Sequence, residues 1–146
     1  MPKISKNASV TLSLICCIVG FLGLVFLAWY FPHLIPEAAD RAASVGIMVL
    51  DYLLLVPVAV ANGFLVKLLL LVRDHLVFTD KAVSCLRTIS WCCFIEAALC
   101  LITARVFFPA HYAAAFVAGF LGLVLRVVKN VIEEAVALKA ENDFTI

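Results

Sequence analysis

The chain has 146 residues, of which 66% are hydrophobic and 14% charged; its formal net charge is +1 and its mean hydropathy is +1.16. A soluble domain of this length cannot bury so much apolar surface, so the composition excludes a water-soluble globular protein. It predicts instead an all-α, polytopic membrane protein, because each helix that crosses a bilayer needs about 20 mostly apolar residues.

Four apolar runs follow one another along the chain, at about residues 10–31, 45–72, 89–108 and 112–128. They leave no room for a separate soluble domain, so residues 1–146 are expected to form a single four-helix transmembrane domain, packed as a compact bundle. The first run is too long to be the apolar part of a signal peptide, which predicts an uncleaved anchor.

The connectors carry the usual helix-breaking and capping signals. Pro32 and Pro36 are expected to end the first helix. A polar turn follows, marked by Glu37, Asp40 and Arg41.

Arg73-Asp74-His75 closes the second helix, and Thr79 followed by Asp80 predicts the N-cap and first turn of the third. This third helix should therefore begin before its apolar run. The short connector at Pro109-Ala110-His111 predicts that the last two spans form an antiparallel hairpin.

After the last span, residues 129–140 are expected to continue as an amphipathic helix. Its apolar positions recur every three or four residues, and its polar positions are expected to face away from them. The apolar set is Val127, Val128, Val131, Ile132, Ala135, Val136 and Leu138, and the polar set is Lys129, Asn130, Glu133 and Glu134. Such a helix either rests on the inner membrane surface or offers a docking surface to a cytoplasmic partner.

Lysine and arginine are sorted to one side of the predicted membrane. Nine of these residues lie on the side of the two termini and the second connector, whereas only Arg41 and Arg105 lie on the other side. The positive-inside rule then predicts that both the N and C termini are cytoplasmic. The basic side would also meet anionic lipids of the bilayer.

Small residues form a stripe on the first and on the last span. The stripe of the first span contains Ser9, Ser13, Cys16, Gly20 and Gly23, and that of the last contains Ala115, Gly119 and Gly122. Both overlap the hexamer Gly-Phe-Leu-Gly-Leu-Val, which occurs at residues 20–25 and 119–124. Small residues let helices approach closely in lipid, so these faces are expected inside the bundle or at the subunit interface of a homo-oligomer.

Ionisable residues within the spans are costly and are therefore candidates for function. Asp51 and Arg105 are expected at the same depth near the outer side, where they either form an ion pair or each reach the interface separately. Asn62 lies eleven residues after Asp51 and on the same stripe of the second span, whereas Lys67 lies opposite and should reach the inner headgroups.

Glu96 is expected close to the middle of the membrane, on a face shared with Cys85, Cys92 and Cys100. It is either a proton- or ion-sensitive carboxylate, or a protonated side chain that is hydrogen-bonded to Asn62 or to a backbone carbonyl. Because it points away from Arg105, these two residues should not pair.

No sequence pattern indicates catalysis. The six cysteines lie within or beside spans and lack the spacing of redox or zinc sites, and no nucleophile, phosphate loop or nucleic-acid motif is present. We therefore expect no enzymatic activity, no cofactor, no metal and no direct binding of nucleic acid.

Two segments carry a family resemblance. The connector Phe78-Thr79, with Val83, Leu86 and Ile89, and the tail from Asn130 to Glu141-Asn142-Asp143-Phe144-Thr145-Ile146 resemble the YoaS-like family of bacterial membrane proteins of unknown function. Most members have leucine where this chain has Phe144. The resemblance implies four spans in a bacterial cytoplasmic membrane and a small helix-turn-helix regulator as partner.

The sequence thus predicts a membrane protein that regulates or scaffolds a cytoplasmic partner. Its predicted interaction surface is the C-terminal segment, which includes Glu133, Glu134, Glu141, Asn142, Asp143 and Thr145. The alternative is a small transporter or channel subunit that uses Glu96, Asn62 and Asp51 within the membrane.

Overall fold

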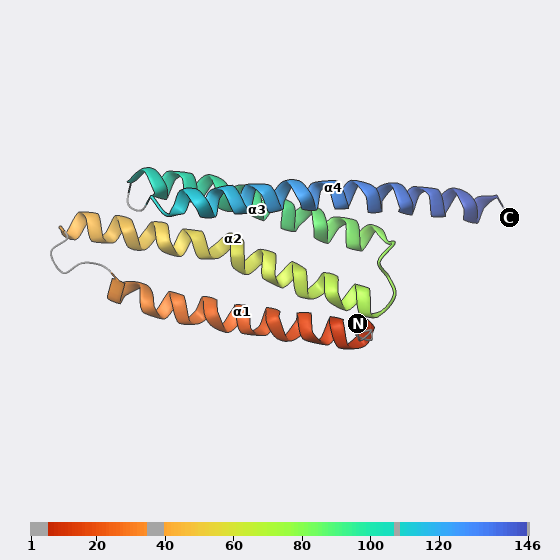
Figure 1. Cartoon of the computed structure of the whole chain (residues 1–146), viewed down its shortest axis with the longest axis horizontal. Helices are drawn as coiled ribbons and strands as arrows, with labels where there is room; N and C mark the ends of the chain where they lie inside the picture. Colours follow the sequence, from red (N-terminus) through yellow and green to blue (C-terminus); the bar gives the residue numbers. More distant parts are fainter. Residues whose placement is uncertain (1–5, 35–39, 107–108, 146) are drawn as a thin grey trace, which may run out of the picture.

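A computed structural model describes residues 6–34, 40–106 and 109–145. These residues form four antiparallel helices, α1 (Lys6–Leu34), α2 (Arg41–Arg73), α3 (Asp80–Val106) and α4 (His111–Phe144) (Figure 1). All four described helices are long and apolar enough to cross a membrane, which confirms the predicted fold class. The chain is therefore a multi-pass α-helical membrane protein.

The helices extend past the apolar runs. α3 begins at Asp80, well before the run at 89–108, as its capping signal predicted. α4 is one continuous helix that projects beyond the ends of the other three (Figure 1). At this end of the molecule α1 begins, α2 ends and α3 begins, and most of the lysine and arginine residues gather here. We call it the basic end.

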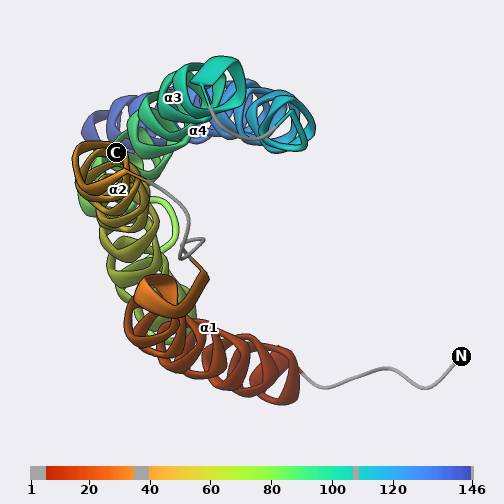
Figure 2. The same ribbon diagram turned by 90° about the vertical axis from the view of Figure 1, so that its left-hand side faces the viewer.

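The helices pack in chain order and do not close on themselves. Among the described residues, α1 contacts only α2, and α4 contacts only α3, while α2 and α3 contact each other. Figure 2 shows the resulting open curve, with α1 at one end and the α3–α4 hairpin at the other. The packing is thus more open than the compact bundle predicted from the sequence. Lipid tails solvate apolar side chains as well as a protein interior does, so nothing forces the curve to close.

The tightest packing joins α3 and α4. Ser90 is fully buried, and its hydroxyl donates to the backbone carbonyl of Gly122 at 2.9 Å. A Cβ added at Gly122 would lie only 3.1 Å from Cε1 of Phe94, which shows how closely the backbones approach. Ala115 is also buried, so the small-residue stripe of α4 lies inside the fold, as predicted. The hairpin of the last two spans is confirmed as well.

α1 is held against α2 by two hydrogen bonds. Asn62 Nδ2 donates to the Cys17 carbonyl at 3.1 Å, and the Tyr52 hydroxyl donates to the Ala28 carbonyl at 3.0 Å. Ala28 precedes Pro32 by four residues, so its carbonyl lacks the usual helical N–H partner. The prediction that Pro32 ends the helix is therefore wrong: it lies inside α1, and a tyrosine from α2 satisfies the carbonyl that the proline leaves free.

The connector between α2 and α3 is a Schellman turn followed by an N-cap. The Leu76 and His75 amides donate to the Leu71 and Val72 carbonyls at 2.8 and 3.2 Å, and His75 has a φ of 59°. The Ala82 amide then donates to the hydroxyl of Thr79 at 3.4 Å. These contacts confirm that Arg73-Asp74-His75 closes α2 and that Thr79 is the N-cap of α3.

The connector between α1 and α2 is described only from Asp40 onward. The predicted polar turn therefore falls largely outside the described residues, as do Pro36, Glu37 and the side chain of Arg41.

Candidate functional site

The intramembrane residues singled out by the sequence are not brought together into one site. Asp51 and Arg105 form no ion pair among the described residues, and Arg105 is exposed. The ion pair, one of the two sequence interpretations, is therefore not formed, and the alternative, in which each side chain reaches the outer interface separately, stays a prediction.

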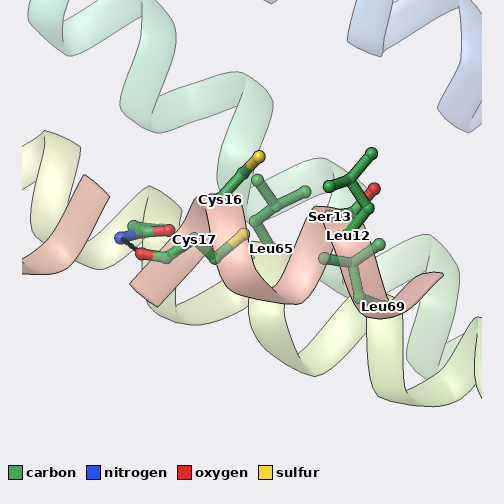
Figure 3. A pocket seen from close by; sticks show the side chains of 7 residues that line it. Leu12, Ser13, Cys16, Cys17, Leu65 and Leu69 are labelled. Atoms are coloured by element: carbon green, nitrogen blue, oxygen red, sulfur yellow. Dashed lines mark hydrogen bonds between the residues drawn. The ribbon is translucent and has the colours of Figure 1, made fainter. Parts of the chain in front are cut away.

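Asn62 serves the packing of α1. Its amide donates to Cys17, so it does not hydrogen-bond Glu96 as one of the sequence interpretations held. The residue also lines an open groove of about 440 Å³ between α1 and α2 (Figure 3). The rest of the lining is Leu12, Ser13, Cys16, Cys17, Leu65 and Leu69. The groove is mostly apolar, which suits an acyl chain or a side chain better than a polar substrate.

Glu96 lies half-buried in the middle of α3. The Cys100 thiol donates to its Oε1 at 3.6 Å, while Oε2 is buried without a hydrogen-bond partner among the described residues. Cys85, Cys92 and Cys100 are all buried, as expected for their shared face. Glu96 lines neither the α1–α2 groove nor the apolar groove of about 360 Å³ between α2 and α3. The described contacts thus connect the carboxyl to no polar path.

A charged cluster joins α3 to α4 at the basic end. The Arg87 guanidinium and the Lys129 ammonium both contact the carboxylate of Glu133, the former at 3.1 Å. The hydrogen bond from Lys129, the charge of Lys129 and the nearby Arg87 hold the pKa of Glu133 below its usual range. Lys129 is 8% exposed, although the sequence pattern placed it on the outward face. That prediction was wrong because Glu133 gives the buried ammonium a partner.

One turn further along the same seam, Arg126 lies against Trp91. The guanidinium carbon is 5.2 Å from the centre of the indole ring, a cation–π contact between α4 and α3. Nη1 of Arg126 is buried and has no acceptor among the described residues. Sequence reasoning missed this pair. The spacing of Arg126, Lys129 and Glu133 places these three on one helix face, but it does not indicate which residue of α3 they meet.

The opposite face of α4 is open. Val127, Val131 and Leu138 are about 60% exposed, and Phe144 is 92% exposed. The predicted apolar face of the extension is thus divided. Ile132, Ala135 and Val136 are half-buried, whereas Val127, Val128, Val131 and Leu138 are exposed.

Together with acidic and polar side chains, the outward residues form a stripe that advances by steps of four and three. It consists of Val127, Val131, Glu134, Leu138, Glu141 and Thr145, which we call the outer stripe. Of the predicted interaction residues, Glu134, Glu141 and Thr145 belong to it and Asn142 is exposed beside it. Glu133 faces α3, and the side chain of Asp143 lies outside the described residues.

The C-terminal tail continues the helix. α4 runs to Phe144, and the Thr145 hydroxyl donates to the Glu141 carbonyl at 2.6 Å. Glu141 and Asn142 therefore lie within the helix, near the projecting end of α4.

The small-residue stripe of α1 is open, in contrast to that of α4. Cys16, Gly20 and Gly23 are exposed, and no atom lies within 4 Å of a Cβ built at Gly23. Its counterpart in the repeated hexamer is Gly122, which is buried. The two copies of the hexamer therefore differ in their packing: the glycines of the copy on α4 lie against α3, and those of the copy on α1 are exposed. A subunit interface on α1 stays a prediction.

These features identify the class of protein: it is a four-helix, multi-pass membrane protein with a helical extension at its basic end. A family model described as "Protein of unknown function (DUF2975)" matches residues 6–146. The chain belongs to this family, which covers the described fold. None of the curated proteins and none of the solved structures compared with the chain matches it.

Proposed function

We propose that this protein regulates or scaffolds a cytoplasmic protein, which docks on the outer stripe of α4. The observation that supports it is the projection of α4 beyond the other helices (Figure 1), with the stripe exposed along it. The count of lysines and arginines orients the basic end, and hence this projection, toward the cytoplasm.

The chemistry of the stripe specifies the kind of partner. Steps of four and three residues match the seam along which two helices pack. Apolar Val131 and Leu138 alternate with acidic Glu134 and Glu141, so a complementary helix would present apolar side chains flanked by lysine or arginine. The partner that we propose is a small helix-turn-helix regulator, as the resemblance to YoaS-like proteins suggests. The same resemblance supports a bacterial cytoplasmic membrane.

Binding of the purified regulator to the full chain in detergent tests this proposal. Leu138→Ala combined with Glu141→Lys should weaken binding by about tenfold or more, since it removes an apolar anchor and reverses a charge. Lys139→Gln is the matched control, because Lys139 is exposed on the same segment but lies off the stripe. The proposal is refuted if the regulator binds the parent protein, the double variant and the control equally, or if it binds none of the three.

The alternative of a transporter or channel subunit gains less support. Asn62 donates to the backbone of α1, and Glu96 accepts from Cys100 on its own helix. Among the described residues, no hydrogen bond or ion pair joins either of them to Asp51. We accordingly propose that the protein is not an enzyme and acts through contacts alone.

A further inference from the structure

The seam between α3 and α4 has more positive charge than its own acceptors satisfy. On one edge of this seam, at the basic end, lie Arg87, Arg126 and Lys129 with a single carboxylate, Glu133. Three cations against one anion leave a formal excess of two charges. Glu133 is already shared between Arg87 and Lys129, so Arg126 has no carboxylate of its own among the described residues.

Arg126 lies at the end of a membrane span, where an unpaired cation is costly. Its Nη1 is buried and lacks an acceptor among the residues that the structure describes, and Trp91 lies against one face of the guanidinium. The indole neutralises no charge. An arginine in this setting normally binds an anion whose oxygens match the planar fork of the guanidinium, and a phosphate group does so.

The surroundings indicate where the phosphate comes from. Trp91 is 53% exposed, and tryptophan is enriched at the level of the lipid headgroups. The neighbouring residue Ile95 on α3 is also exposed, which provides an apolar surface for acyl chains beside the cations. A free phosphate ion would gain nothing from this apolar surface.

We propose that the edge formed by Arg87, Trp91, Arg126 and Lys129 binds the phosphate headgroup of an anionic phospholipid. Arg126 donates to the phosphate oxygens, and Trp91 packs against the upper acyl chain. Lys129 and Arg87 add positive charge and remain anchored by Glu133. The site is independent of the outer stripe, because it lies on the face of α4 that packs against α3.

Quenching of Trp91 fluorescence by brominated lipids tests the proposal. The chain contains two tryptophans, so Trp29→Phe leaves Trp91 as the only reporter. This protein is reconstituted into phosphatidylcholine vesicles that contain an equal small fraction of brominated phosphatidylglycerol or brominated phosphatidylcholine. Brominated phosphatidylglycerol should quench the fluorescence of Trp91 more strongly than brominated phosphatidylcholine does. Unlabelled phosphatidylglycerol should remove this excess quenching. Equal quenching by the two lipids would overturn the proposal.

A variant identifies the cation responsible. Arg126→Gln should weaken the apparent affinity for phosphatidylglycerol by about fivefold, the effect expected of one cation near an anionic surface. Arg73→Gln is the control, since Arg73 is exposed at the same end but away from the seam. Equal losses in both variants would show general attraction to the surface and refute the site. If Arg126→Gln fails to fold, the competition between brominated and unlabelled phosphatidylglycerol in the Trp29→Phe protein still tests the proposal.

A third measurement separates the lipid from a free anion. Inorganic phosphate at millimolar concentration, at constant ionic strength, should leave the excess quenching unchanged. Its removal by phosphate would show that the edge recognises the ion alone, and the lipid assignment would be wrong.

Discussion

At the scale of single residues, the two copies of Gly-Phe-Leu-Gly-Leu-Val offer an experiment within one chain. Gly122→Ala should destabilise the fold by about 1–3 kcal/mol, because the new Cβ would lie 3.1 Å from Phe94 and 3.3 Å from Cβ of Cys93. Gly23→Ala in the other copy meets nothing within 4 Å and should be neutral or stabilising. Unfolding of both variants in mixed micelles, followed by circular dichroism, measures the difference. Equal effects would contradict the packing of α4.

Glu133 predicts a response to acid. The pKa of Glu133 is lowered in the fold, so its contribution to stability is complete above the ordinary value of 4.5 and is lost as the pH falls further. Lys129→Gln should raise the pKa toward 4.5 more than Arg87→Gln does, because the hydrogen bond from Lys129 is the larger cause. A carboxyl carbon NMR titration measures both. A pKa of Glu133 that neither variant changes would contradict the cluster.

The limits of sequence reasoning are also clearest at this scale. Glu96 could be located and its cysteine-rich face predicted, since helical periodicity alone determines both. The partners of Asn62 and Arg126 could not, because they depend on the register of two helices. Lys129 pairs with Glu133 four residues along the same helix, a spacing that can be read from the sequence. In a membrane the lipid-facing and helix-facing sides are equally apolar, so the hydrophobic pattern does not indicate which side is packed.

At the scale of the element, helix ends were predictable where a side chain forms the cap. Thr79 is an example. The end of α2 was located, but its Schellman turn was not, because His75 occupies the left-handed position where glycine is usual. Pro32 was wrongly predicted to end α1. A membrane helix tolerates proline when a neighbouring helix satisfies the carbonyl that the proline leaves free, as Tyr52 does for Ala28.

The end of α2 gives a second stability prediction. His75 has a φ of 59°, a conformation that costs a side chain about 1–2 kcal/mol and costs glycine almost nothing. His75→Gly should therefore raise the free energy of unfolding by about 1 kcal/mol. His75→Ala is the control, because alanine keeps the Cβ and should give no such gain. The same micelle titration measures both, and equal shifts would show that the φ angle is not the cause.

At the scale of the whole molecule, the number of spans follows from the sequence, but the open curve does not. The four apolar runs predict a compact bundle, but they do not indicate how many neighbours each helix has. The structure shows that α1 needs only α2 (Figure 2). One consequence is that the helices differ in how firmly they are held. Most of the buried residues lie on α3 and α4, whereas α1 packs on α2 alone at one edge of the curve.

This difference predicts the order in which the protein comes apart. When the chain is pulled from its N-terminus in a bicelle, α1 should leave as a separate first step, because only the α1–α2 contacts hold it. Asn62→Leu and Tyr52→Phe remove its two hydrogen bonds to α2 and should each weaken that step by about 0.6 kcal/mol, the typical value for such bonds in a membrane. The step that opens the α3–α4 hairpin should not change. Tyr30→Phe, which alters an exposed tyrosine on α1 itself, serves as the control. If α1 left together with α3 and α4 in a single step, the open arrangement of the helices would be wrong.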